Sequence, residues 1–295
     1  SKYLPEFKDL WVRQSNKDGV QTLVKAKNVL TVRMVMNHTG GFGFELPNYT
    51  AMGGWSRRMP LRSVAATAAS QPIAFEPGTK AQYSNVGIDI GAAVVEVVTG
   101  KRWETFLQER VLDPLGMKDT TFWPTDAQLA KKIEIYSVKP GEEAKWVEQN
   151  SAMQRPYGDD RVFPSAGAGL WTTVRDQLKF YKMLMNLGVG ENGVRILKEE
   201  TVKSILAVST RPKGLGGYSL GLSAPETDTE DQWFGHGGAW ATNCVVNWHK
   251  RQLKLIAVQF IRDTKQFASA FNEGANKFFK TQIDKSTDEY SGRMK

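Results

Sequence analysis

The sequence predicts an α/β fold in which a mainly helical region precedes an antiparallel sheet flanked by helices. Two observations support this prediction. Before about residue 210, apolar residues recur at helical spacing between capping residues and glycines, whereas beyond it they fall in short strand-like runs. We therefore expect one domain over residues 1–295, with a mainly helical part at 11–209 and a strand part at 210–295 that also carries a C-terminal helix.

Helix boundaries are predicted by residues whose side chains can accept hydrogen bonds from the free backbone N–H groups at a helix start, and by glycines that end a helix. Thr31 is suited to cap a short helix over 32–37, because its hydroxyl accepts a hydrogen bond from a free backbone N–H. A longer helix follows Asn85 and ends at Gly100, which readily takes the left-handed conformation. Further helices are predicted at 101–112, 174–187 (capped by Thr173), 198–207 and 266–283.

The strand part contains runs of apolar and β-branched residues separated by turn residues. Strands are predicted at 218–223, 232–235, 240–248 and 253–261, with a turn at 249–251 between the last two. Such a succession of short strands favours an antiparallel arrangement, which the closing helix would cover.

Composition excludes several classes of protein. The chain has 295 residues, 39 Lys and Arg against 31 Asp and Glu, and its basic residues are scattered, which does not favour a nucleic-acid partner. The single cysteine, Cys244, rules out an internal disulfide, and no apolar run approaches the roughly 20 residues of a membrane span. The three histidines lack the spacing of metal ligands, so we expect no metal or other cofactor.

Two short motifs could carry chemistry. Tyr83-Ser84-Asn85 stands at the entrance of a predicted helix, and alone it reads as a capping turn. The segment 234–240, Phe-Gly-His-Gly-Gly-Ala-Trp, joins two predicted strands, and alone it reads as a glycine-rich hairpin with a surface histidine, His236.

Together and in this order, the motifs resemble those of the penicillin-recognising serine hydrolases, namely class C β-lactamases, DD-peptidases and family VIII esterases. Other segments extend the resemblance from residue 1 to about 261: His38-Thr39-Gly40-Gly41, the lead-in Phe75-Glu76-Pro77-Gly78, Asp113–Met117 and Ser165–Leu170. The resemblance implies a β-lactamase-like fold with a helical subdomain. It also implies a small-molecule ester, β-lactam or peptide substrate and a bacterial exported or periplasmic location, which the sequence itself leaves open together with the oligomeric state.

One family motif is absent. The nucleophile of these enzymes belongs to a Ser-x-x-Lys sequence, which occurs nowhere in the chain, and Thr22-Leu23-Val24-Lys25 is a poor imitation on the wrong side of Tyr3-Leu4-Pro5. We therefore expect the serine, the lysine and the first strands of the sheet upstream of residue 1, and we expect this chain alone to be inactive.

The resemblance also implies roles for individual residues. Tyr83 would transfer protons, Asn85 would bind the substrate amide and orient the lysine, and His236 would hydrogen-bond Tyr83 or the substrate. The backbone N–H of Ala239 would be an oxyanion donor. The remaining substrate-binding residues would be Gly237, Gly238 and Trp240.

Two alternatives remain. Gly217-Tyr218-Ser219-Leu220-Gly221 fits the Gly-x-Ser-x-Gly pattern of α/β-hydrolases, with Asp228, Glu230, Asp231 and His236 downstream, but it lacks the strand-turn-helix context that this pattern requires. The second alternative is a non-catalytic relative that binds peptides or peptidoglycan fragments at the same place.

Overall fold

The computed structural model describes most of the chain. The described residues are 2–15, 18–46, 59–138, 143, 145–146, 163–206, 208–227, 229–239, 242–262, 273–274, 276–278 and 280. Its helical elements are η1 (Pro5–Phe7), α1 (Val32–Met36), α2 (Leu61–Ala69), α3 (Asn85–Thr99), α4 (Trp103–Leu107), the π-helix η4 (Gln108–Leu112), α5 (Asp113–Leu115), α6 (Asp126–Leu129), α7 (Val174–Met185) and α8 (Glu199–Ile205). No helix among these residues has the length and apolar character needed to cross a membrane.

The predicted caps are present at the helix ends. The Thr31 hydroxyl accepts from the Met34 N–H at 3.2 Å, and Thr173 likewise caps α7 through the Asp176 N–H at 3.3 Å. Gly100 ends α3 with a φ of 68°. The helix predicted over 101–112 instead begins at Trp103 and runs through a π turn to Leu115, since Pro114 lies in the first turn of α5, where its missing N–H costs nothing.

The C-terminal strands form an antiparallel sheet, as predicted, with shifted boundaries. Strands β5 (Phe234–Gly237), β6 (Asn243–Asn247) and β7 (Gln252–Ile256) are hydrogen-bonded in that order, and α7 packs against β6 and β7. Gly235 lies opposite Val245 in this register, and a side chain on Gly235 would meet the Cys244 carbonyl oxygen at 2.0 Å. The sheet therefore fixes the position of His236, and it leaves no room for a side chain at residue 235.

Two predicted strands are wrong. Residues 218–223 form isolated bridges, Tyr218 with Ser223 and Ser223 with Gly235, rather than a strand. Gly221, with a φ of 83°, turns the chain, and the Ser219 N–H donates to the Leu222 carbonyl. The run 253–261 splits after β7, where the Thr242 hydroxyl donates to the Val258 carbonyl at 3.0 Å and takes the place of a ladder bond.

The remaining strands lie in two smaller sheets. Strand β8 (Phe260–Arg262) pairs in parallel with β3 (Tyr136–Val138), which in turn pairs antiparallel with β4 (Lys145–Trp146), so this small sheet is mixed. Most of the predicted helix 266–283 lies outside the described residues, and those of its residues that are described are helical.

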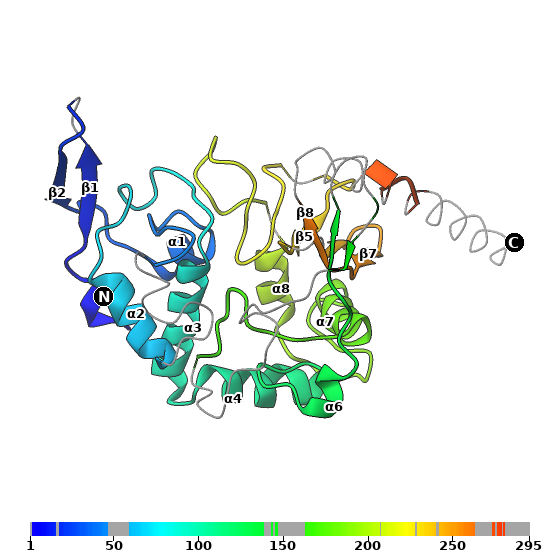
Figure 1. Ribbon diagram of the computed structural model, residues 1–295. Helices are drawn as coiled ribbons and strands as arrows, with labels where there is room; N and C mark the ends of the chain where they lie inside the picture. Colours follow the sequence, from blue (N-terminus) through cyan, green and yellow to red (C-terminus); the bar gives the residue numbers. More distant parts are fainter. Residues whose placement is uncertain are drawn as a thin grey trace, which may run out of the picture.

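An N-terminal hairpin is an element that the sequence analysis did not predict. Strands β1 (Trp11–Ser15) and β2 (Gln21–Lys25) pair antiparallel, and Figure 1 shows the hairpin extending from the end of the molecule where α2 and α3 lie, with α7 and β7 at the other end. The part over 11–209 therefore also contains strands, and its division from 210–295 within one domain stays a prediction.

Two apolar clusters form the core, one at each end of the molecule. The first joins the N-terminal segment to α2 and α3, with Val64, Ala93 and Phe163 almost completely buried. The second joins α7 and α8 to the sheet β5-β6-β7, around Met183 and Phe234. Polar contacts connect the two ends: the Asn37 side chain donates to the Thr210 carbonyl at 3.1 Å, and Arg211 Nε donates to the Asn37 carbonyl at 2.7 Å.

Candidate active site

Tyr83 stands at the entrance of α3, where the preceding loop is held by its neighbours. The Ser84 hydroxyl caps the helix by accepting from the Gly87 N–H at 2.9 Å, and it donates to the Gly43 carbonyl at 2.8 Å. The Asn85 N–H donates to the Phe44 carbonyl at 3.2 Å. The capping turn expected for this tripeptide is therefore present, and it leaves Tyr83 with 38% of its surface exposed.

Asn85 is the first residue of α3 and is only 4% exposed. Its Nδ2 donates to Glu45 Oε1 at 3.1 Å. Gly167 packs so closely on it that an added Cβ would lie 2.8 Å from the Asn85 Cβ. The amide is thus near Tyr83, as predicted, but its nitrogen is bonded to a carboxylate that the sequence analysis did not single out.

Asp89, one helical turn after Asn85, fixes the segment that carries Gly167. Its Oδ1 accepts from the Ser165 hydroxyl at 3.0 Å and from the N–H groups of Ala166 at 2.8 Å and Gly167 at 3.3 Å. A carboxylate that accepts several hydrogen bonds in a buried site holds its donors strongly. Asp89 therefore keeps the predicted Ser165–Leu170 loop against Asn85.

His38 lies behind Tyr83 in an unusual backbone conformation. Its φ is 64°, in the left-handed region, and its side chain is 1% exposed. Nδ1 accepts from the Ser84 N–H at 3.3 Å, so the proton of the neutral ring is on Nε2, which is buried and has no hydrogen-bond partner in the part of the chain that the structure describes. The ring centroid is 4.4 Å from that of Tyr83 and 4.5 Å from that of Tyr218.

His236, in β5, completes a group of four rings, His38, Tyr83, Tyr218 and His236, which we call the four-ring cluster. The His236 ring centroid is 5.7 Å from that of Tyr83 and 6.1 Å from that of Tyr218. Its Nδ1 lies 2.7 Å from the Gly237 carbonyl oxygen. The structure thus brings together the two residues, Tyr83 and His236, that sequence reasoning selected from segments about 150 positions apart, and it adds Tyr218.

Burial keeps the four-ring cluster uncharged near neutral pH. It lowers the pKa of His38 from 6.5 to about 4, with smaller contributions from the charges of Arg211 and His236. Burial also lowers the pKa of His236, although the hydrogen bond with the Gly237 carbonyl acts to raise it. Burial raises the pKa of Tyr83. The site therefore offers neutral imidazoles and protonated phenols, which donate and accept hydrogen bonds without carrying charge.

Arg211 is a cation that acts on this group, and two of its donors bond to backbone carbonyls. Nε donates to the Asn37 carbonyl at 2.7 Å and Nη1 to the Leu215 carbonyl at 3.2 Å. Its guanidinium carbon is 4.8 Å from the centre of the Tyr218 ring, within the range of a cation–π contact. Arg211 therefore supports Tyr218 and the His38 turn at once.

The glycines after His236 form an exposed edge beside the four-ring cluster. Gly237 and Gly238 are exposed, and the Gly238 N–H donates to the Thr242 carbonyl at 2.6 Å, which closes a tight turn. Ala239 is exposed in that turn. Trp240, which was predicted to contact substrate, lies outside the described residues.

Ser219 does not have the surroundings of an α/β-hydrolase nucleophile. Its side chain is completely buried, and its hydroxyl has no hydrogen-bond partner among the described residues. In the described segment directly after it, residues 220–227, no helix begins, and His236 Nδ1 faces a backbone carbonyl rather than an acid. Of the downstream acids, Asp231 pairs with Lys250, and Asp228 lies outside the described residues. The described surroundings of Ser219 therefore differ from those of a nucleophile elbow.

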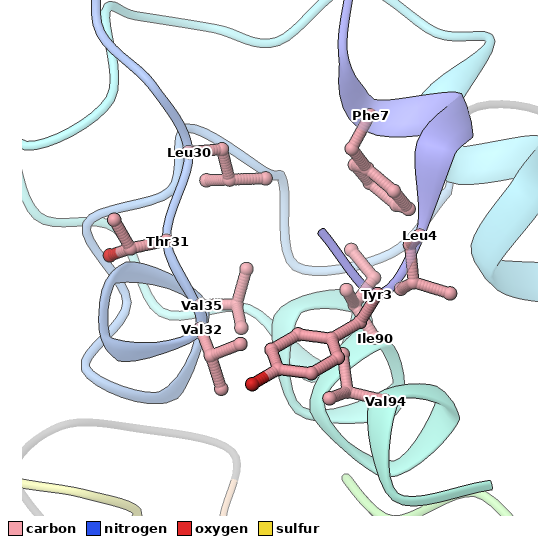
Figure 2. Close-up of a pocket in the computed structure, with 9 residues that line it drawn as sticks. All are labelled: Tyr3, Leu4, Phe7, Leu30, Thr31, Val32, Val35, Ile90 and Val94. Atoms are coloured by element: carbon pink, nitrogen blue, oxygen red, sulfur yellow. The ribbon is translucent and has the colours of Figure 1, made fainter. Parts of the chain in front are cut away.

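A separate apolar hollow lies at the N-terminal end. Figure 2 shows its walls, which come from the first residues of the chain, α1 and the middle of α3; they are Tyr3, Leu4, Phe7, Leu30, Thr31, Val32, Val35, Ile90 and Val94. It contains no charged side chain and none of the predicted site residues. In the described part of the chain, no three His, Cys, Asp or Glu side chains gather as a metal site would require.

Comparison with known proteins places these features in a family. Among curated proteins, one from Escherichia coli (strain K12) named "Putative D-alanyl-D-alanine carboxypeptidase" is 26% identical over 268 residues, which cover 84% of this chain and 58% of that protein. "Protein Rv1367c" from Mycobacterium tuberculosis is 26% identical over 210 residues, which cover 69% of this chain and 50% of that protein. The chain thus spans between half and three-fifths of the length of these relatives.

Solved structures share the fold. The chain matches EstCE1, described as a hydrolase with promiscuous acyltransferase activity, with a TM-score of 0.63 and 21% identity over 88% of this chain and 71% of that one. It matches the LovD6 mutant of simvastatin synthase from Aspergillus terreus with a TM-score of 0.67 and 19% identity over 90% of this chain and 70% of that one. These likenesses confirm the β-lactamase-like α/β fold. A family model described as Beta-lactamase matches residues 1–265, and the chain therefore belongs to the beta-lactamase family, as its resemblance to penicillin-recognising serine hydrolases predicts.

Proposed function

We propose that the chain is the larger part of a serine hydrolase that acts through an acyl-enzyme on an ester, amide or β-lactam carbonyl. The nucleophilic serine and its lysine would come from a segment outside these 295 residues, since no Ser-x-x-Lys occurs in them. The observation that supports the proposal best is the pairing of Tyr83 and His236, whose ring centroids are 5.7 Å apart beside the exposed Ala239 turn.

In the proposed reaction, the serine oxygen bonds to the carbonyl carbon, and its proton passes through Tyr83 to the departing alcohol or amine. Water then attacks the acyl-enzyme, which releases the acid and restores the serine. Because burial raises the pKa of Tyr83, the phenol is protonated in the described surroundings and needs a nearby cation, the lysine, to accept a proton. His236 would hydrogen-bond this phenol or the substrate, and Asn85 would orient the lysine.

The oxyanion that forms on the carbonyl would be stabilised by backbone N–H groups, that of the serine and that of Ala239. Removing one such donor typically costs about 3 kcal/mol of barrier. Gly237 and Gly238, which lack side chains and are exposed, would let the substrate approach β5, and Trp240 would line the same edge.

The test uses the full-length protein that contains the upstream segment, with the 295-residue chain beside it. Both are treated with a fluorophosphonate, and the labelled residue is located by mass spectrometry. We expect label on a serine outside residues 1–295, three positions before a lysine, with turnover of p-nitrophenyl acetate, and we expect no label on the 295-residue chain. Stoichiometric label on a serine within 1–295 would contradict the mechanism, and binding without any label or turnover would favour the non-catalytic relative.

A further inference from the structure

An exposed aromatic pair borders the candidate active site on the side of residues 43–45. The Phe44 side chain is 51% exposed, Tyr83 is 38% exposed, and their ring centroids are 5.9 Å apart, tilted by 32°. We call these two rings the aromatic platform. Exposed neighbouring rings are costly in water and are typical of surfaces that bind another apolar group.

The platform is held in place by its backbone rather than by packing of the rings. The Gly43 carbonyl accepts from the Ser84 hydroxyl at 2.8 Å, and the Phe44 carbonyl accepts from the Asn85 N–H at 3.2 Å. Behind Tyr83, the buried His38 ring lies 4.4 Å away, centroid to centroid. The platform is thus pre-formed on the same helix entrance that carries Tyr83 and Asn85, so a group bound there lies beside the reacting atoms of the proposed mechanism.

The charges around the platform do not suit an anionic substrate. Glu45 follows Phe44 directly, and its carboxylate accepts from Asn85 Nδ2 at 3.1 Å. The neighbouring cation, Arg211, gives Nε and Nη1 to backbone carbonyls and lies against Tyr218. His236 is bonded through Nδ1 to the Gly237 carbonyl. A substrate carboxylate beside the platform would therefore meet the like charge of Glu45.

We propose that the aromatic platform binds an uncharged apolar group of the substrate, so that the site selects neutral acyl esters over compounds with a carboxylate next to the scissile carbonyl. This inference rests on the proposed hydrolase function and makes Phe44 a specificity-determining residue. The inference predicts that this chain differs from a D-alanyl-D-alanine carboxypeptidase, the activity for which its Escherichia coli relative is named, since the departing residue of a D-alanyl-D-alanine peptide carries a carboxylate.

The first experiment measures binding, which needs no nucleophile. Phenylacetamide and phenylacetate have the same ring and differ in charge, and their binding to the 295-residue chain can be followed by ligand-observed NMR. We expect phenylacetamide to bind more tightly, Phe44→Ala to abolish that binding, and Trp11→Ala, which removes an exposed aromatic on the β1–β2 hairpin, to leave it unchanged. Equal or tighter binding of phenylacetate would overturn the inference.

The second experiment compares kcat/KM of the full-length protein for p-nitrophenyl phenylacetate, p-nitrophenyl acetate, nitrocefin and an N-acyl-D-Ala-D-Ala peptide. We expect the phenylacetate ester to be the best substrate. Phe44→Ala removes roughly 50–60 Å² of apolar contact, which should lower kcat/KM for p-nitrophenyl phenylacetate about tenfold. It should change kcat/KM for p-nitrophenyl acetate less than about twofold. Glu45→Gln should raise kcat/KM for nitrocefin by about threefold, the effect of one like charge about 7 Å away in water.

The outcomes separate the two proposals. If none of the four substrates acylates the full-length protein, the hydrolase function fails. If the protein turns over nitrocefin or the peptide faster than the phenylacetate ester, only the substrate class is wrong. An equal loss on both esters in Phe44→Ala, or a lower melting temperature with unchanged kcat/KM, would make Phe44 a structural residue and would also refute the inference.

Discussion

Replacement of Gly235 by alanine tests the register of the sheet that carries His236. A Cβ at this position would lie 2.0 Å from the Cys244 carbonyl oxygen and 2.6 Å from the Val245 Cα, and both are backbone atoms that cannot rotate away. Strands β5 and β6 would have to separate locally by about 1 Å or more. Overpacking of this kind costs about 1–3 kcal/mol.

Two backbone hydrogen bonds on the opposite edge of β5 would be distorted by the same movement, since Gly235 accepts from the Ser223 N–H at 2.7 Å and donates to the Ser223 carbonyl at 3.2 Å. At about 1 kcal/mol each, they bring the expected destabilisation to about 3–5 kcal/mol. For a chain of this size, that lowers the melting temperature by roughly 5–8 °C.

Gly237→Ala is the matched control, because it lies two residues further along the same strand and on the same face. The nearest atom to its added Cβ is Asn243 Oδ1 at 3.7 Å, an ordinary contact. Thermal unfolding of the 295-residue chain, followed by circular dichroism, should therefore leave Gly237→Ala within about 1 °C of the parent. If Gly235→Ala melts with the parent, or if Gly237→Ala is the less stable of the two, the pairing of Gly235 with Val245 is incorrect.

Three further predictions concern the candidate site. In the full-length protein, Tyr83→Phe should lower kcat by about 10²- to 10⁴-fold with little change in KM, and His236→Ala should lower it less; a Tyr83→Phe enzyme that keeps more than about a third of kcat would reduce Tyr83 to a capping-turn residue. Burial lowers the pKa of His38 from 6.5 to about 4 in the folded protein, so as the pH falls His38 is protonated first in the unfolded chain. The free energy of unfolding should therefore be highest above pH 6.5 and decrease by about 3 kcal/mol toward pH 4. Asparagine tolerates the left-handed backbone and keeps an acceptor for the Ser84 N–H, so His38→Asn should lose less unfolding free energy than the parent between about pH 7 and pH 4.5, as measured by urea unfolding. An equal loss in parent and variant would exclude His38 as the cause. Ser219→Ala removes a buried hydroxyl that has no hydrogen-bond partner among the described residues, so it should change the free energy of unfolding by less than about 1 kcal/mol and leave esterase activity intact. A roughly thousandfold loss of activity would instead favour the α/β-hydrolase interpretation.

Local signals were enough to predict the helices that lead into the site. Thr31, Thr173 and Gly100 act through hydrogen bonds or backbone freedom within a few residues of themselves, so the sequence shows them directly. The β1–β2 hairpin was missed although Asp18-Gly19 is a turn signal, because the strands on either side are polar and mostly exposed and show no apolar alternation.

The site itself was predictable only in part, because its composition depends on long-range packing. Tyr83, Asn85 and His236 belong to recognisable motifs. Tyr218 enters the four-ring cluster through a segment that was read as a strand and is in fact a turn. Phe44 and Glu45 meet Tyr83 and Asn85 only through backbone and side-chain contacts between two loops, which no periodicity in the sequence reports.

The hydrogen bonds between Asn37 and the segment at Thr210 and Arg211 also decide when the site can form. They span 173 and 174 positions of sequence, and the closure of so long a loop has to precede the contacts that reward it. His38 and Tyr83 are synthesised well before their ring partners Tyr218 and His236. A nascent chain that has emerged only as far as α7 therefore carries His38 and Tyr83 without their ring partners, so the four-ring cluster can form only after residue 236 has been synthesised.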